Sequence, residues 1–256
     1  MLDKICLYLT TKLSLKMILH NHYSPNFSKK PRDSKNIKVI VIHYTGMQSK
    51  IASIERLSSP KYKVSCHFVI DRKGQVMQMV QEKYAAWHAG KSKWKNFINL
   101  NRFSLGIELV NKGHEFGYES FTDLQIKELI KLCLQLKKKY NIKNSNIVGH
   151  SDIAPNRKID PGEKFPWQKL KKYKLGIWYK NVKLKLIKLN EKKIEKLFFK
   201  NLFKIGYRYF SLNRRTKNDI FIIKAFQRRF YSNNITGKID KKTYIISHFL
   251  ANHIKN

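Results

Sequence analysis

The first two thirds of the chain contain short apolar runs whose patterns predict β-strands. Residues 38–43, Lys-Val-Ile-Val-Ile-His, form a continuous β-branched run that is typical of a buried strand. Residues 67–71 and 75–80 flank a glycine-containing turn, and the second run alternates polar and apolar positions, which predicts a hairpin. Two further strands are predicted over residues 104–110 and 146–149.

Apolar residues at helical spacing predict helices between these strands. The clearest pattern begins after Thr122 and continues to Tyr140, and Thr122 with Gln125 fits a capping box. A shorter helix is predicted over residues 51–57. Strands and helices mixed in this order predict an α/β domain, in which helices flank a central mixed β-sheet.

The pattern changes near residue 180, and from residue 184 onward it is helical. Residues 190–206, 218–231 and 241–253 predict a small three-helix domain. The lysine-rich stretch 169–190 is a plausible connector.

These patterns divide the chain into three parts. We expect an N-terminal lead-in over residues 1–36, a main α/β domain over 37–180 and a helical domain over 184–256. Residues 5–19 are apolar but are interrupted by lysines, so they predict an eroded export signal or a short leading helix and show no clear signal peptide or lipobox. No segment reaches the about 20 uninterrupted apolar residues of a membrane span.

Composition adds a strong positive charge, with a formal net charge of +36 over 256 residues. Such a charge favours contact with polyanions, and a nucleic-acid-binding protein is one reading. The lysines are spread along the chain, and Lys, Asn, Ile, Tyr and Phe all have A/T-rich codons, so drift in genome composition is an alternative source. Three widely spaced cysteines predict no disulfide framework.

Two histidines and an aspartate form a candidate metal site. His43 ends the first buried strand, His150 follows the strand at 146–149, and Asp160 lies ten residues later in a segment rich in proline and glycine. Two imidazoles and one carboxylate, with water as the fourth ligand, make an open zinc site of the catalytic type. Taken alone, a histidine at a strand end is more often a structural residue held by a hydrogen bond.

Two charged residues complete a candidate hydrolytic site. Glu108 is the one charged side chain in the apolar segment 105–110, and a buried carboxylate is costly unless it is paired or used. It is therefore a candidate general base, with a salt bridge to a lysine as the alternative. Lys158 lies two residues before Asp160 and is a candidate to stabilise an oxyanion.

Several ordered stretches between residues 37 and 168 resemble the zinc-dependent N-acetylmuramoyl-L-alanine amidases of type 2, the peptidoglycan-recognition-protein family. The stretches are Val-Ile-His43-Tyr-Thr, Cys-His67-Phe-Val-Ile-Asp-Arg-Lys-Gly, Ala-Trp87-His88-Ala-Gly, Leu-Gly-Ile-Glu108-Leu-Val and Val-Gly-His150-Ser-Asp-Ile-Ala-Pro-Asn-Arg-Lys158-Ile-Asp160-Pro-Gly.

The resemblance implies an enzyme that binds Zn²⁺ and cleaves the amide between N-acetylmuramic acid, or its anhydro form, and L-alanine of the stem peptide. It implies zinc on His43, His150 and Asp160, with Glu108 and Lys158 as catalytic residues. It also implies a substrate-binding groove, for which the candidates are Tyr44, Trp87, His88 and Asn111.

The helical tail resembles a peptidoglycan-binding module through residues 225–230 and 235–243. A catalytic domain with such a tail is similar to an outer-membrane lipoprotein amidase of bacteria. The resemblance implies peptidoglycan or muropeptides as partners, with no specific nucleic acid, and we expect a monomer. It places the protein in the bacterial cell envelope, in periplasm or outer membrane, with the cytoplasm as the alternative. A non-catalytic peptidoglycan-binding protein is the rival function.

Overall fold

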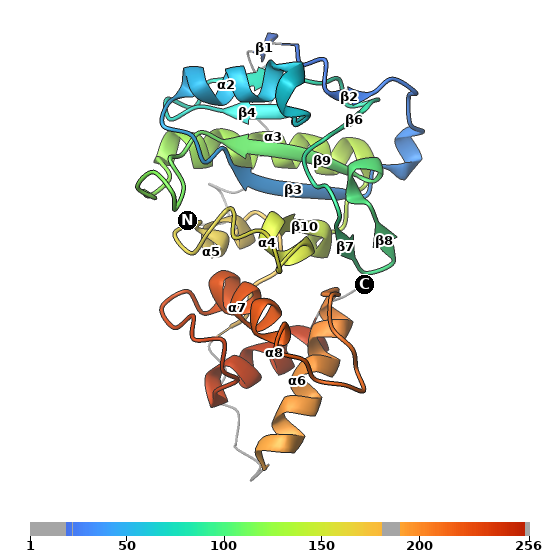
Figure 1. Cartoon of the computed structure of the whole chain (residues 1–256), viewed down its shortest axis with the longest axis vertical. Coiled ribbons are helices and arrows are strands. Elements are labelled where there is room, and N and C mark those ends of the chain that lie inside the picture. The colour runs from blue at the N-terminus through green and yellow to red at the C-terminus, as the bar shows by residue number, and fades with distance from the viewer. Residues whose placement is uncertain (1–18, 22, 181–189, 254–256) are drawn as a thin grey trace, which may run out of the picture.

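The structure is a computed structural model that describes residues 19–21, 23–180 and 190–253, so the predicted features of residues 5–18 and 181–189 lie outside the described residues. Its centre is a six-stranded mixed sheet with the strand order β1-β5-β4-β9-β3-β10 (Figure 1). The strands are β1 (Leu19–Asn21), β3 (Val39–Tyr44), β4 (Phe68–Ile70), β5 (Val76–Gln78), β9 (Ser104–Leu109) and β10 (Ile147–Gly149).

The middle of the sheet is parallel. Strand β3 pairs in parallel with β9 on one side and with β10 on the other, and this register places His43 opposite Glu108. Strands β4 and β5 form the predicted antiparallel hairpin, whose turn contains Gly74 at φ 80°. The side chain of Asp71 accepts hydrogen bonds from the backbone of Lys73 and Gln75 and so stabilises this turn.

Helix α3 (Asp123–Tyr140) lies across one face of the sheet (Figure 1). The predicted capping box is present, because Thr122 accepts from the backbone of Gln125 and the Gln125 side chain accepts from the backbone of Thr122. The remaining elements of the first 180 residues are short. They are α2 (Lys50–Ser58), α4 (His150–Ile153), α5 (Trp167–Lys171), β2 (Phe27–Ser28), β6 (Ala85–Ala86), β7 (Lys93–Trp94), β8 (Phe97–Ile98) and 3-10 turns at Ser34–Asn36, Pro60–Tyr62, Leu100–Arg102 and Asn144–Asn146.

Two regions differ locally from the sequence expectation. The sequence predicted no strand within the lead-in at residues 1–36, yet β1 pairs with β5 and β2 pairs with β6. The segment after residue 149 was expected to be a loop, but its first residues form helix α4. The Asp152 carboxylate accepts from the Gly149 backbone N–H at 2.8 Å and stabilises that turn.

Each face of the sheet is covered by a different hydrophobic cluster. The cluster under α3 joins strand residues such as Ile40, Ile42 and Ile107 to Leu129 and Leu132 of that helix. The cluster on the other face joins strand residues to the C-terminal helices. Its buried members include Val39, Val41, Val148, Phe198, Phe199, Leu202, Ile222, Phe226, Phe230, Ile246 and Leu250.

The C-terminal helices are α6 (Glu191–Ile205), α7 (Asp219–Phe230) and α8 (Lys241–His253), and they lie along the β10 edge (Figure 1). A buried ion pair joins them to the sheet layer. Arg229 of α7 donates to the Asp152 carboxylate, and its second Nη donates to the Ile147 carbonyl at 3.1 Å. Tyr207 also donates to Asp152, at 2.6 Å. The helical layer therefore contacts the turn that begins at His150.

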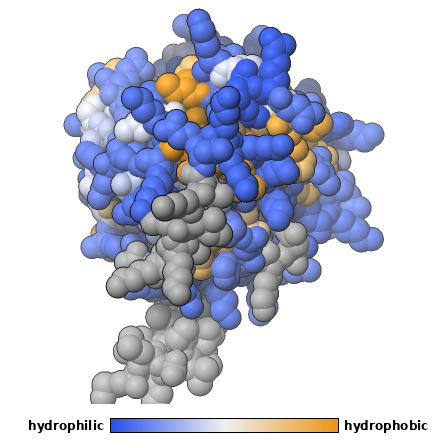
Figure 2. Space-filling view, turned by 90° about the horizontal axis from the view of Figure 1, so that it is seen from below, coloured by the Kyte–Doolittle hydropathy of each residue, from blue (hydrophilic) through white to orange (hydrophobic). Residues whose placement is uncertain are grey.

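The predicted fold class is confirmed, including the helical C-terminal region. The boundary between a domain at 37–180 and one at 184–256 stays a prediction, because the junction falls in residues 181–189. The face formed by the C-terminal side is mostly hydrophilic, with small separate hydrophobic patches (Figure 2). Within the described ranges, the helices are all too short or too polar to cross a membrane.

Candidate metal centre

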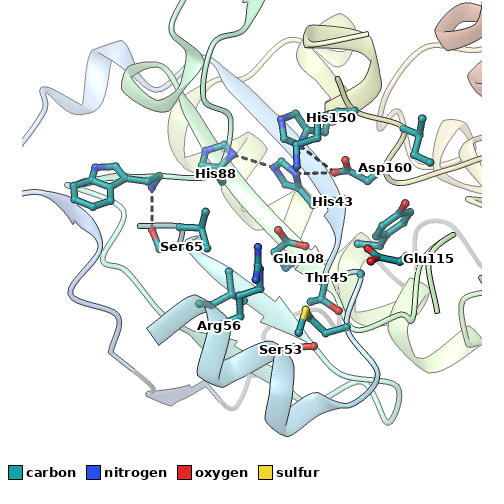
Figure 3. A pocket seen from close by; sticks show the side chains of 18 of the residues that line it. His43, Thr45, Ser53, Arg56, Ser65, His88, Glu108, Glu115, His150 and Asp160 are labelled. Atoms are coloured by element: carbon teal, nitrogen blue, oxygen red, sulfur yellow. Dashed lines mark hydrogen bonds and ion pairs between the residues drawn. The ribbon is translucent and has the colours of Figure 1, made fainter. Parts of the chain in front are cut away.

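Three buried side chains converge beside the carboxyl end of β3 (Figure 3). His43 comes from β3, His150 is the first residue of α4, and Asp160 lies in the loop that follows. The His43 Nδ1 atom lies 3.0 Å from the His150 Nδ1 atom and 2.9 Å from Asp160 Oδ2, and His150 Nδ1 lies 3.1 Å from the same oxygen. The residues predicted from the sequence as metal ligands are thus adjacent.

The donor set fits a zinc ion. Zinc–ligand distances of about 2.0–2.2 Å place neighbouring ligand atoms of a tetrahedral site about 3.3 Å apart, close to the separations found for these three atoms. Two imidazole nitrogens and a carboxylate oxygen that face one another bring several lone pairs together, which a cation would stabilise.

Burial also prepares these groups for metal binding. Desolvation, aided by the neighbouring His150, lowers the pKa of His43 to about 4, so its imidazole is neutral at neutral pH. Burial alone would raise the pKa of Asp160, but the adjacent His150 and His43 hold it below its ordinary value. Neutral imidazole and ionised carboxylate are the forms that bind metals.

The far nitrogens of both histidines contact one short segment of chain. His43 Nε2 lies 3.0 Å from His88 Nδ1, and His150 Nε2 lies 3.2 Å from the Ala89 carbonyl oxygen. His88 is buried, and desolvation together with the nearby His43 lowers its pKa well below the ordinary value. The Trp-His-Ala-Gly stretch singled out in the sequence therefore lies against both candidate ligands.

Glu108 projects from β9 beside His43 (Figure 3). Burial, followed by repulsion from Asp160, raises the pKa of Glu108 well above the ordinary value, and Lys158 opposes this shift. Its Oε2 atom is shielded from solvent and has no hydrogen-bond partner among the residues that the structure describes. A buried carboxyl group whose pKa is raised by its surroundings is typical of a general base in an active site.

These side chains line one cavity of about 540 Å³. Of the other candidate site residues, the cavity is also lined by Tyr44, Trp87, His88 and Lys158. Asn111, a predicted substrate-binding residue, does not line this cavity. Its side chain donates to the Glu119 carbonyl and accepts from the Gly113 backbone, which holds it within its own loop.

The cavity also contains residues that the sequence interpretation did not identify. They include Arg56 on α2, Ser65 before β4, Glu115 and Arg157. Arg157 donates to the carbonyls of Ala89 and Lys91. It could have been identified from the sequence, because it is adjacent to the predicted residue Lys158. The other positions have ordinary polar surroundings in the sequence, and nothing there marks them.

A polar chain connects the cavity to the C-terminal helices. Tyr44 Oη lies 2.9 Å from His114 Nδ1, and His114 Nε2 lies 3.1 Å from the carboxylate of Glu163. Arg228 of α7 approaches the same carboxylate at 3.7 Å. Burial raises the pKa of Tyr44 to about 12, so its hydroxyl stays protonated at neutral pH.

Comparison with known sequences identifies a family. Residues 33–163, about half of the chain, match the family described as N-acetylmuramoyl-L-alanine amidase. The amidase AmiD of Escherichia coli K12 is 39% identical over 156 residues, which span 56% of this chain and 55% of AmiD. The 1,6-anhydro-N-acetylmuramyl-L-alanine amidase AmpD of Haemophilus influenzae is 35% identical over 164 residues, which span 57% of this chain and 86% of AmpD.

Comparison with solved structures extends the likeness into the C-terminal helices. AmiD from E. coli, in complex with the substrate anhydro-N-acetylmuramic acid-L-Ala-D-γ-Glu-L-Lys, aligns with a TM-score of 0.71 and 30% identity, covering 88% of this chain and 91% of AmiD. AmpDh3 from Pseudomonas aeruginosa aligns with a TM-score of 0.72 and 26% identity, covering 88% and 94%. From its motifs, its sheet and its match over residues 33–163, the chain belongs to the N-acetylmuramoyl-L-alanine amidase family.

Proposed function

We propose that this protein is a zinc-dependent amidase that hydrolyses the bond between N-acetylmuramic acid, or its anhydro form, and L-alanine of peptidoglycan or muropeptides. The observation that carries the proposal is the convergence of His43, His150 and Asp160 at one wall of a cavity that also contains Glu108. The family and the substrate bound by E. coli AmiD support the choice of substrate.

His43, His150 and Asp160 would hold the zinc ion through the three atoms that face one another. Zinc, when bound, supplies a Lewis acid that polarises the scissile carbonyl and lowers the pKa of a water molecule. With three protein ligands, the site has the composition of a catalytic zinc centre that keeps a position open.

Glu108 would act as the proton carrier of the reaction. Its carboxylate accepts a proton from the attacking water, and the same proton passes to the nitrogen of L-alanine as the amide bond breaks. The products are a free muramic acid carboxyl group and a peptide with a free amino terminus. Lys158, exposed on the loop before Asp160, would stabilise the negative charge that develops on the carbonyl oxygen.

Tyr44 and Trp87 would contact the substrate, since both are half-buried residues of the cavity wall. The Tyr44 hydroxyl is held by His114 and can donate or accept, and the Trp87 ring offers an apolar surface. Action in the bacterial envelope and the monomeric state are further parts of this proposal.

Mass spectrometry of a defined digestion tests the function. The full chain, loaded with zinc, is incubated with anhydro-N-acetylmuramic acid carrying an L-alanyl stem peptide. We expect free anhydro-N-acetylmuramic acid and intact stem peptide in equal amounts, and Glu108→Gln is the matched control that should leave the substrate uncleaved. Binding of the muropeptide without cleavage by the zinc-loaded wild type would instead identify a non-catalytic peptidoglycan-binding protein.

A further inference from the structure

We infer that His88 and Ala89 form a positioning segment, defined as these two residues, that orients both candidate histidine ligands with their Nδ1 lone pairs toward the metal centre. His88 also lines the cavity, and in this assignment it is a positioning residue that acts through His43. The inference deepens the proposed function, because it depends on a metal bound at His43 and His150.

The Leu100 carbonyl oxygen can only accept a hydrogen bond, and this determines which nitrogen of His88 carries its proton. The Ser104 hydroxyl donates to the Leu100 carbonyl at 2.6 Å, which uses its one proton. His88 Nε2 lies 3.1 Å from the same hydroxyl oxygen. Since that oxygen has no second proton, His88 must supply the hydrogen of this contact, and its Nε2 atom therefore carries the proton.

The protonation of His88 determines which nitrogen of His43 carries its proton. A neutral imidazole has one N–H and one lone pair, so His88 Nδ1 is an acceptor once Nε2 is the donor. His43 Nε2, 3.0 Å away, must then donate to it. The remaining His43 nitrogen, Nδ1, keeps a lone pair directed at His150 and Asp160, as a metal ligand requires.

Ala89 determines which nitrogen of the second candidate ligand, His150, carries its proton. The Ala89 carbonyl can only accept, so His150 Nε2, 3.2 Å away, donates to it and leaves the His150 Nδ1 lone pair free. The positioning segment is itself fixed, because its two backbone N–H groups both donate to Asn101 Oδ1, at 3.1 and 2.7 Å.

The His88 ring packs against the sheet at a glycine, where there is no side chain to displace it. Gly106 of β9 lies under the His88 ring, and a Cβ atom at Gly106 would fall 2.4 Å from His88 Cγ. His88 is only 9% exposed, so most of its surface is used by contacts within the protein. Close packing against β9 and hydrogen bonds at both ring nitrogens are what a positioning role needs.

The test measures zinc affinity by chelator competition and the protonation of the histidine nitrogens by ¹⁵N NMR of the zinc-loaded full chain. His88→Phe keeps a ring and removes the acceptor, and loss of such outer contacts typically weakens metal binding about 10–100-fold. His88→Asn places an amide oxygen near the position of Nδ1 and should recover most of the affinity. Leu129→Ala, buried on the opposite face of the sheet, is the control for general destabilisation and should leave zinc affinity unchanged.

In the wild type, NMR should show His88 protonated at Nε2 and bare at Nδ1. A folded His88→Phe variant with wild-type zinc affinity, or a wild-type His88 protonated at Nδ1, would overturn the inference. Ser104→Ala covers the case in which His88→Phe does not fold. We expect it to give mixed His88 protonation and weaker zinc binding, and unchanged values in both measurements would also overturn the inference.

These readouts need no turnover and so separate this inference from the proposed function. Zinc binding with the expected protonation but no muropeptide cleavage would leave the inference standing and reject the amidase proposal.

Discussion

The two faces of the central sheet carry different kinds of side chain. Strand β9 reads Ser-Leu-Gly-Ile-Glu-Leu, so Leu105 and Ile107 point to the α3 face while Gly106 and Glu108 point to the other. Pairing with β3 places His43 beside Glu108 on that second face. The first, the α3 face, is an apolar layer packed mainly under α3. The second, the metal face, carries the candidate metal centre beside a hydrophobic cluster that contacts the C-terminal helices.

The comparison shows how stability and function are divided within a single strand. The α3 face satisfies ordinary packing, with its strand residues fully buried against α3. The metal face contains a carboxyl group whose pKa is raised by burial, and two histidines whose Nε2 atoms contact His88 and Ala89. The candidate site therefore lies on the face where the burial of polar groups is costly, and packing on the α3 face offsets that cost.

The largest expected effect follows from removing Glu108, the proposed proton carrier, from the metal face. Glu108→Gln should reduce the turnover number for a muropeptide by about 10²–10⁴-fold, because general acid–base catalysis contributes about that much. Zinc content, measured by mass spectrometry of the metal, should stay at the wild-type level since Glu108 is not among the clustered donor atoms. Wild-type turnover by this variant would remove Glu108 from the mechanism.

The next effect concerns the ion pair that attaches the C-terminal helices to the metal face. Arg229→Met should lower the free energy of unfolding by about 3–5 kcal/mol, because it leaves the buried Asp152 charge without its partner. Lys169→Met is the matched control. Its pair with Asp123 is largely exposed, so its loss should cost at most about 1 kcal/mol. Denaturant titration measures both, and equal effects would contradict the structural role of Arg229.

A slightly smaller loss of stability is expected from a substitution on the α3 face. Leu129→Ala removes a fully buried side chain of α3 and should cost about 2–5 kcal/mol of stability. Turnover per folded molecule should not change, because this residue is separated from the cavity by the sheet. A marked fall in turnover by the folded variant would show that the two faces are coupled.

The smallest effect is a gain in stability. The pKa of Glu108 is raised in the folded protein. Its contribution to the free energy of unfolding is therefore fully present below the ordinary carboxyl pKa of about 4.3 and is lost as pH rises through the pKa of the folded state. In metal-free protein, Glu108→Gln removes this loss. Its melting temperature should therefore exceed that of the wild type at neutral pH, and the difference should shrink toward about pH 4. A constant difference across this range would argue against a raised pKa.

Much of this comparison could be predicted from periodicity and motifs. The β-branched run at 38–43, the hairpin and the capping box at Thr122 identify elements that the structure contains, because each is set by local residues. The candidate ligands could be proposed because His43 and His150 follow strand patterns. Parallel strands bring such ends together, as β3 and β10 do.

Other features depend on contacts between distant segments, which a single sequence does not reveal. The short pairs β2–β6 and β7–β8 have no clear pattern of their own. Asn111 shares its loop with the predicted site, yet its side chain bonds within that loop. Arg229 is one of many basic residues, and its burial against Asp152 follows from how α7 packs on α4.

X-ray absorption of the zinc-loaded wild type tests directly whether His43, His150 and Asp160 hold a zinc ion. We predict one zinc ion per chain, with two imidazole nitrogens and at least one carboxylate oxygen at about 2.0–2.2 Å. A sulfur ligand, scattering from fewer than two imidazoles, or failure of the folded chain to retain zinc would contradict it.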